Sequence, residues 1–257
     1  MNPAQFAVVI SVVLFFAMVA CLEMGYRIGG YAAKQIENAH EGTSTIEAAI
    51  FALLGLLLAF TFSNGISHLD QRRQLIIQES NAIGTAYLRV DLLPANQQPG
   101  MRHLFRQYLD SRLGMYAKLP DLTAADAELD HATKIQQEIW SRAIDASRDD
   151  PTQNVARLLL PALNDMIDVT TSRTIALHTH LPPLIFGLSI SVALLSGLLA
   201  GYDMAKRRKR SWFHGILYSV VIAITIFTVI DLDYPRFGVI RLTAADNAMI
   251  QLRDSIK

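Results

Sequence analysis

FTFSNGISHLDQRRQ, residues 60–74, joins an apolar segment of membrane character to a charged segment that is compatible with a helix. The stretch contains no proline, and its single glycine is Gly65. A glycine inside a helix costs about 1 kcal/mol relative to alanine, and neighbouring contacts can offset that cost. The sequence therefore predicts one helix that leaves the lipid bilayer and continues into water.

The composition is typical of a membrane protein. The chain has 257 residues, of which 51% are hydrophobic and 18% charged, and its mean hydropathy is +0.27. Soluble domains carry about 25% charged residues. The 23 basic and 23 acidic residues balance, so we expect no attraction to nucleic acid. Cys21 is the only cysteine, which excludes an intrachain disulfide.

Apolar segments long enough to cross a bilayer occur at four places. Crossing the hydrocarbon core of about 30 Å takes about 20 helical residues. The segments cover about residues 6–22, 47–63, 182–202 and 213–230. The first could instead be a signal peptide, but residues 1–5 lack the Lys or Arg of such a leader, so we expect a retained helix.

Between the second and third spans, apolar residues recur at helical spacing, which predicts an aqueous helical bundle over residues 64–181. Prolines divide this bundle into four helices and predict a kink in the last one. They are Pro94, Pro120, Pro151 and Pro161. Residues 231–257 form a C-terminal tail. We predict an all-α integral membrane protein in which residues 1–257 form a single integrated unit.

A basic run follows the third span and predicts the orientation in the membrane. It consists of Lys206, Arg207, Arg208, Lys209 and Arg210. A basic cluster in a short loop stays on the cytoplasmic side, and it also attracts anionic lipid. With four crossings, both termini and the helical bundle are then predicted to face the periplasmic or outer side.

Small residues recur at every third or fourth position in two of the spans. The second span contains Ala48, Ala52, Gly55, Ala59 and Ser63, and the third contains Ser189, Ala193, Gly197 and Gly201. Small residues let membrane helices approach closely. The two stripes therefore predict tight helix contacts, either within one chain or between copies of it.

Catalytic and metal-binding motifs are absent from the sequence. It contains no phosphate-binding glycine loop, nucleophile elbow or paired metal-ligand spacing, so we expect no enzyme, no cofactor and no metal site. His178 and His180 come nearest to a metal pair, but helical residues two apart point to different faces. On the second helix, a charged surface that is solvated or ion-paired is predicted for His68, Asp70, Arg72, Arg73 and Glu79.

Residues 54–89, LGLLLAFTFSNGISHLDQRRQLIIQESNAIGTAYLR, resemble the bacterial family of bestrophin-like domain proteins. The C-terminal DLDYPRFG, residues 231–238, fits the same family pattern, and the resemblance covers nearly the whole chain. More distantly, the chain is similar to bestrophins, which are pentameric ion channels. The resemblance implies a homo-oligomeric, channel-like protein of the bacterial inner (cytoplasmic) membrane that conducts small ions.

The resemblance also implies which residues line a pore. In bestrophins, apolar residues four apart on the second helix line a constriction that ends at a phenylalanine. The matching positions here are Ala52, Leu56 and Phe60, with Asn64 one turn further. An apolar ring of this kind can gate conduction by dewetting. The alternative for Leu56 and Phe60 is contact with lipid or a place in the core of the bundle.

Two aspartates follow the fourth span and have two interpretations. Asp231 and Asp233 would attract cations at a pore mouth or would simply end the helix, where Pro235 and Gly238 favour a fixed turn. Bestrophins keep their aqueous domain and termini in the cytosol, whereas the basic run predicts the reverse orientation for this chain. The alternative to a channel is a non-conducting membrane scaffold or envelope signalling protein whose helical bundle binds a protein partner.

Overall fold

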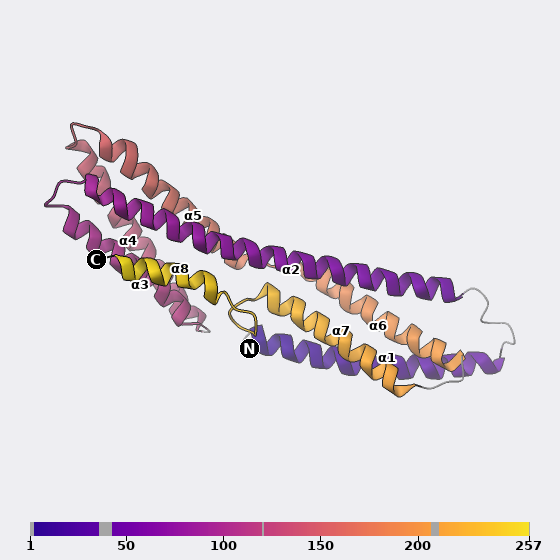
Figure 1. Cartoon of the computed structure of the whole chain (residues 1–257). Coiled ribbons are helices and arrows are strands. Elements are labelled where there is room, and N and C mark those ends of the chain that lie inside the picture. Colours follow the sequence, from indigo (N-terminus) through magenta and orange to yellow (C-terminus); the bar gives the residue numbers. More distant parts are fainter. Residues whose placement is uncertain (1–2, 36–42, 120, 207–210, 257) are drawn as a thin grey trace. The chain divides into compact units, whose positions relative to one another are not determined.

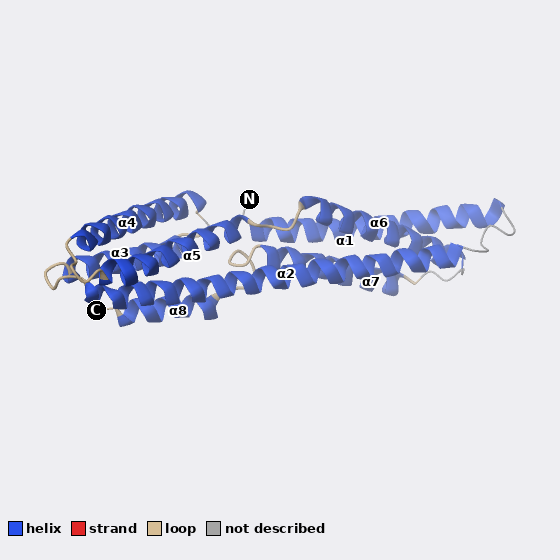
Figure 2. Ribbon diagram, turned by 90° about the horizontal axis from the view of Figure 1, so that it is seen from above, coloured by secondary structure: helices blue, strands red, loops and turns tan. Residues whose placement is uncertain are grey.

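The computed structural model describes residues 3–35, 43–119, 121–206 and 211–256. In those residues Figure 2 shows helices joined by loops and no strand, which confirms the all-α prediction. The elements in chain order are α1 (Pro3–Gln35), α2 (Thr43–Leu88), η1 (Arg89–Leu92), α3 (Gln98–Ala117), α4 (Leu122–Arg148), η2 (Val155–Leu159), α5 (Leu160–His178), α6 (Pro183–Lys206), α7 (Trp212–Asp233) and α8 (Thr243–Ser255).

The chain divides into two compact units. Unit 1 comprises Met1–Leu69 and His180–Ile240, and unit 2 comprises Asp70–Thr179 and Arg241–Lys257. This division does not test whether the two units act together, so the single integrated unit stays a prediction.

Four helical stretches are long and apolar enough to span a membrane, as predicted. They are Gln5–Tyr31, Thr45–Leu92, Val155–Lys206 and Trp212–Asp233. Helix α2 is continuous over 46 residues. At about 1.5 Å per residue this is roughly twice the thickness of the hydrocarbon core, so α2 is long enough to continue well beyond a bilayer. Gly65 does not interrupt it.

Unit 1 is built on close packing of α1 against α6 and α7 (Figure 1). The small residues of α6 face inward, and Gly197 and Gly201 are both buried. A Cβ atom added at Gly201 would lie 2.0 Å from the carbonyl oxygen of Leu22 in α1, and one added at Gly25 would lie 1.9 Å from the carbonyl oxygen of Leu198. Only glycine allows this approach, so the α6 stripe packs within the chain.

The small-residue stripe of α2 behaves differently. Its five members are all exposed in the chain: Ala48, Ala52, Gly55, Ala59 and Ser63. A Cβ atom added at Gly55 would meet no heavy atom within 4 Å. Of the two alternatives left open by the sequence, packing within one chain therefore holds for α6 and does not hold for α2.

Unit 2 contains the helices that the prolines predicted. Asp121 caps α4 by accepting a hydrogen bond of 3.1 Å from the backbone N–H of Ala124. A π-helical turn, η2, lies directly before α5, next to Pro161, and the kink itself stays a prediction. A π-helical turn is one of the recognised ways in which a helix bends.

The predicted C-terminal tail contains a helix that the sequence analysis missed. Helix α8 packs in unit 2, where the Ser80 hydroxyl donates to the carbonyl oxygen of Ala248 at 3.2 Å. Arg253 Nε donates to Asp110 Oδ1 at 2.8 Å. The residues after Leu242 are therefore part of the bundle of unit 2.

Candidate functional site

Helix α2 buries one narrow seam along its length. Most of the buried positions follow one another in steps of three, four or seven, which keeps them on one side of the helix. In unit 1 they are Glu47, Leu54, Leu58, Thr61 and Gly65, and in unit 2 they are Arg72, Ile76, Glu79, Ser80, Ile83, Ala86 and Tyr87. The chain thus covers a minor part of the α2 surface and leaves the rest open.

The four predicted pore-lining residues lie on the open part of α2. Ala52, Leu56, Phe60 and Asn64 are all exposed, with exposed fractions of 53% for Leu56 and 61% for Phe60. A place in the core of the chain's own bundle is thereby excluded for Leu56 and Phe60. Lining a pore stays a prediction for this face, with contact with lipid as the remaining alternative for Leu56 and Phe60.

Asp231 organises the turn that follows α7. Its buried carboxylate accepts hydrogen bonds from the backbone N–H groups of Val239, at 3.1 Å, and Ile240, at 2.9 Å. A Cβ atom added at Gly238 would lie 1.4 Å from Asp231 Oδ1, so only glycine fits there. These contacts are those of a residue that ends a helix and fixes a turn.

Asp233 is completely buried at the last position of α7. Its Oδ1 accepts a hydrogen bond of 3.2 Å from the backbone N–H of Leu181. The Nδ1 atoms of two histidines also face it, at 3.3 Å for His180 and 3.8 Å for His68. Both carboxylates are buried and accept hydrogen bonds from backbone N–H groups of unit 1. The predicted role of the two aspartates in attracting cations stays a prediction.

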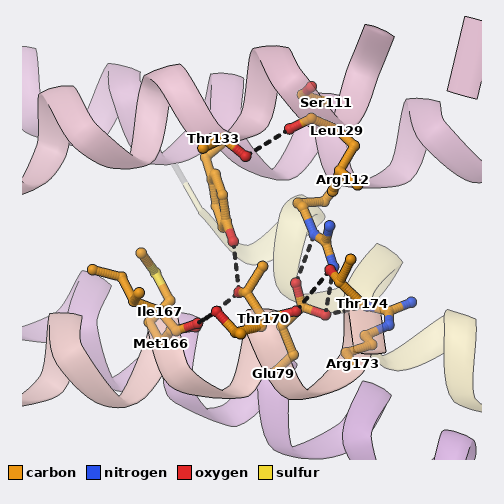
Figure 3. Close-up of polar contacts among 12 residues, drawn as sticks. Glu79, Ser111, Arg112, Leu129, Thr133, Met166, Ile167, Thr170, Arg173 and Thr174 are labelled. Atoms are coloured by element: carbon orange, nitrogen blue, oxygen red, sulfur yellow. Dashed lines mark hydrogen bonds and ion pairs between the residues drawn. The ribbon is translucent and has the colours of Figure 1, made fainter. Parts of the chain in front are cut away.

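A buried ionic cluster joins α2, α3 and α5 in unit 2 (Figure 3). Arg112 of α3 holds Glu79 of α2 in a bidentate pair, with Nε to Oε1 at 2.7 Å and Nη2 to Oε2 at 3.1 Å. Arg173 of α5 pairs with Oε2 of the same glutamate. The exposed fractions are 0% for Glu79, 1% for Arg112 and 2% for Arg173.

Two tyrosines, Tyr108 and Tyr116, lie beside the ionic cluster. The hydroxyl of Tyr108 is hydrogen-bonded to that of Thr170 at 2.9 Å, and burial raises the pKa of Tyr108 to about 12. The guanidinium of Arg173 lies over the Tyr116 ring, 4.6 Å from its centroid, in a cation–π contact. Burial alone would lower the pKa of Arg112, but attraction to Glu79 outweighs it and holds this pKa well above its ordinary value.

The buried cluster corrects the charged surface predicted from the sequence. Asp70 and Arg73 are exposed, as expected, whereas Arg72 and Glu79 are buried. Arg72 donates to the carbonyl oxygens of Ala176 and Thr179 at the end of α5, at 3.1 and 2.8 Å. The spacing in the sequence does indicate that Glu79 is buried, because Glu79 falls three residues after Ile76 and four before Ile83.

The remaining sequence-predicted residues are placed as follows. His178 is exposed near the end of α5. His180, by contrast, contacts Asp233. Within the described part of the chain, no group of three or more His, Cys, Asp or Glu side chains is arranged to hold a metal ion. Of the basic run, Lys206 ends α6, and residues 207–210 lie outside the described residues.

Replacing Glu79 tests the ionic cluster. Glu79→Gln leaves two buried arginines without a counter-charge, so we expect it to lower the free energy of unfolding by about 3–5 kcal/mol. The matched control is Glu138→Gln, which breaks a pair with Arg142 that is about half exposed, and we expect it to cost at most about 0.5 kcal/mol. Thermal unfolding in detergent measures both, and equal losses would contradict the assignment.

Comparison with known proteins identifies the family. The sequence matches the bestrophin-like domain over residues 15–246. Searches of curated proteins and of solved structures both returned no match. The matched range includes α2 with its exposed face, the ionic cluster and the turn at Asp231. A match over this much of the chain shows that the protein belongs to the bestrophin-like domain family.

Proposed function

We propose that the protein is an oligomeric membrane channel for small ions in which the α2 helices of several copies surround a central path. The exposed face of α2 is the observation that carries this proposal. Small residues on a membrane helix let another helix approach, and the chain already uses such a stripe where α6 meets α1. In the described part of the chain the stripe of α2 has no such partner, which a neighbouring copy would supply.

The chemistry of this face suits a gated path. Copies of Leu56 and Phe60 around an axis would form apolar rings, which can close a path by expelling water. Asn64, one turn further along α2, would add a ring of polar amides. The family relationship supports the same arrangement, with five copies by resemblance to bestrophins.

Recordings in planar bilayers test conduction directly. We expect purified wild-type protein to conduct, and we expect Phe60→Ala to raise the conductance or the open probability, because it removes the largest apolar side chain from the constriction. The matched control is Phe62→Ala, on another side of α2 and 39% exposed, which should behave as wild type. No conductance from any preparation, or identical effects of the two variants, would contradict the proposal and would favour a scaffold.

We further propose that the protein lies in a bacterial inner membrane with the ends of α1 and α6 on the cytoplasmic side. Lys206 to Arg210 support this orientation, because basic residues in a short loop resist translocation. Exposed aromatic residues occur near the same end of unit 1 and would lie at the membrane surface. They are Tyr31, Trp212 and Phe213.

A reporter fused after Lys257 tests the orientation. Alkaline phosphatase is active only when exported, so we expect high activity from this fusion. A fluorescent protein that matures only in the cytoplasm, fused at the same position, should then be dark. A bright fluorescent fusion with an inactive phosphatase fusion would show the opposite orientation.

A further inference from the structure

The end of α7 holds a group of titratable side chains that the proposed path does not use. Asp233 is completely buried, and the two histidines that face it come from different segments of unit 1. His68 lies on α2, one turn beyond Asn64, with its Nδ1 atom 3.8 Å from Asp233 Oδ1. His180 lies before α6, with its Nδ1 atom 3.3 Å from Asp233 Oδ2.

Both histidine Nδ1 atoms are buried and without a hydrogen-bond partner. The side chains are nevertheless 28% and 32% exposed for His68 and His180, so protons from solvent can reach the rings. A buried nitrogen without a hydrogen bond weakens the fold. Imidazole is also the side chain whose charge ordinarily changes between pH 5 and 8.

We propose that Asp233, His68 and His180 form a proton-binding site at the end of α7. A proton taken up from solvent by either imidazole leaves both of its ring nitrogens as N–H groups and places a positive charge beside the carboxylate. The contact then becomes an ion pair, with the Nδ1 atom 3.3 Å from the carboxylate for His180 and 3.8 Å for His68. Because the two imidazoles share one carboxylate, the first proton opposes binding of the second.

His180 is the better placed of the two histidines. Its Nδ1 atom is the nearer, and its ring stacks on Tyr234 with centroids 4.2 Å apart and planes 19° from parallel. A protonated imidazole gains from lying on an aromatic face. The neighbouring carboxylate of Asp231 is turned to the backbone N–H groups of Val239 and Ile240 and does not compete for the proton.

The site lies next to a close contact between α2 and α7 in unit 1. A Cβ atom added at Gly65 of α2 would be 3.2 Å from the Cβ of Leu232, next to Asp233. A proton bound by His68 therefore ties α2 to the end of α7, and a proton bound by His180 ties the segment before α6 to it. An effect of pH on conduction would rest on the function proposed above, whereas proton binding itself does not depend on it.

Thermal unfolding of the full chain in detergent, at pH 8 and at pH 5.5, tests the site without reference to conduction. We expect His180→Gln to lower the unfolding midpoint by about 4 °C at pH 5.5 and by about 1 °C at pH 8, since glutamine cannot take up the proton. The matched control is His103→Gln on α3, where the side chain is exposed. Its midpoint should follow that of wild type at both pH values.

Two further variants separate a proton site from a merely structural contact. His68→Gln should show the same pH dependence as His180→Gln with a smaller difference, because its contact is longer. In Asp233→Asn, adding His180→Gln should have the same effect at both pH values. If Asp233→Asn does not fold, the unfolding midpoints of His180→Gln and His68→Gln at the two pH values test the proposal on their own. A loss in His180→Gln that is equal at pH 8 and pH 5.5 would overturn the proposal.

Discussion

The structure depends on one property of α2, which is that the rest of the chain buries only a small part of its surface. A helix of 46 residues buries mainly one side, and its membrane half leaves alanine, glycine, leucine and phenylalanine residues exposed. The same chain packs α1 and α6 so closely that Gly25 and Gly201 admit no side chain. The exposed face of α2 is therefore not a sign of loose packing throughout unit 1, and α1 likewise leaves large apolar side chains such as Val13 and Phe16 exposed.

Charge plays a different part in the two units. In unit 2, one buried glutamate is shared by two arginines from α3 and α5, which joins three helices at a point that water does not reach. In unit 1, a buried aspartate faces two histidines and accepts a hydrogen bond from the backbone N–H of Leu181. The first arrangement pairs a carboxylate with arginines, which stay protonated, and the second is the site for which we propose proton binding.

The sequence predicted features that depend on short stretches of the chain. The four spans follow from windows of about 20 apolar residues, and Pro94 and Pro151 end helices wherever the rest of the chain lies, while Pro120 lies outside the described residues. Burial of Glu79 was missed, because its partners Arg112 and Arg173 are 33 and 94 residues away in the sequence. The junction at Asp233 was missed for the same reason, since His68 and His180 belong to different elements. Helix α8 is short, at 13 residues, and the basis for its stability lies in contacts with distant residues such as Ser80 and Asp110.

Single-particle imaging of the protein purified in detergent tests most directly whether copies of the chain meet through α2. The account predicts a closed ring in which α2 is the innermost helix of every copy and in which Leu56 and Phe60 face the axis. A solitary chain would contradict it, as would a ring whose centre is lined by α1, α6 or α7.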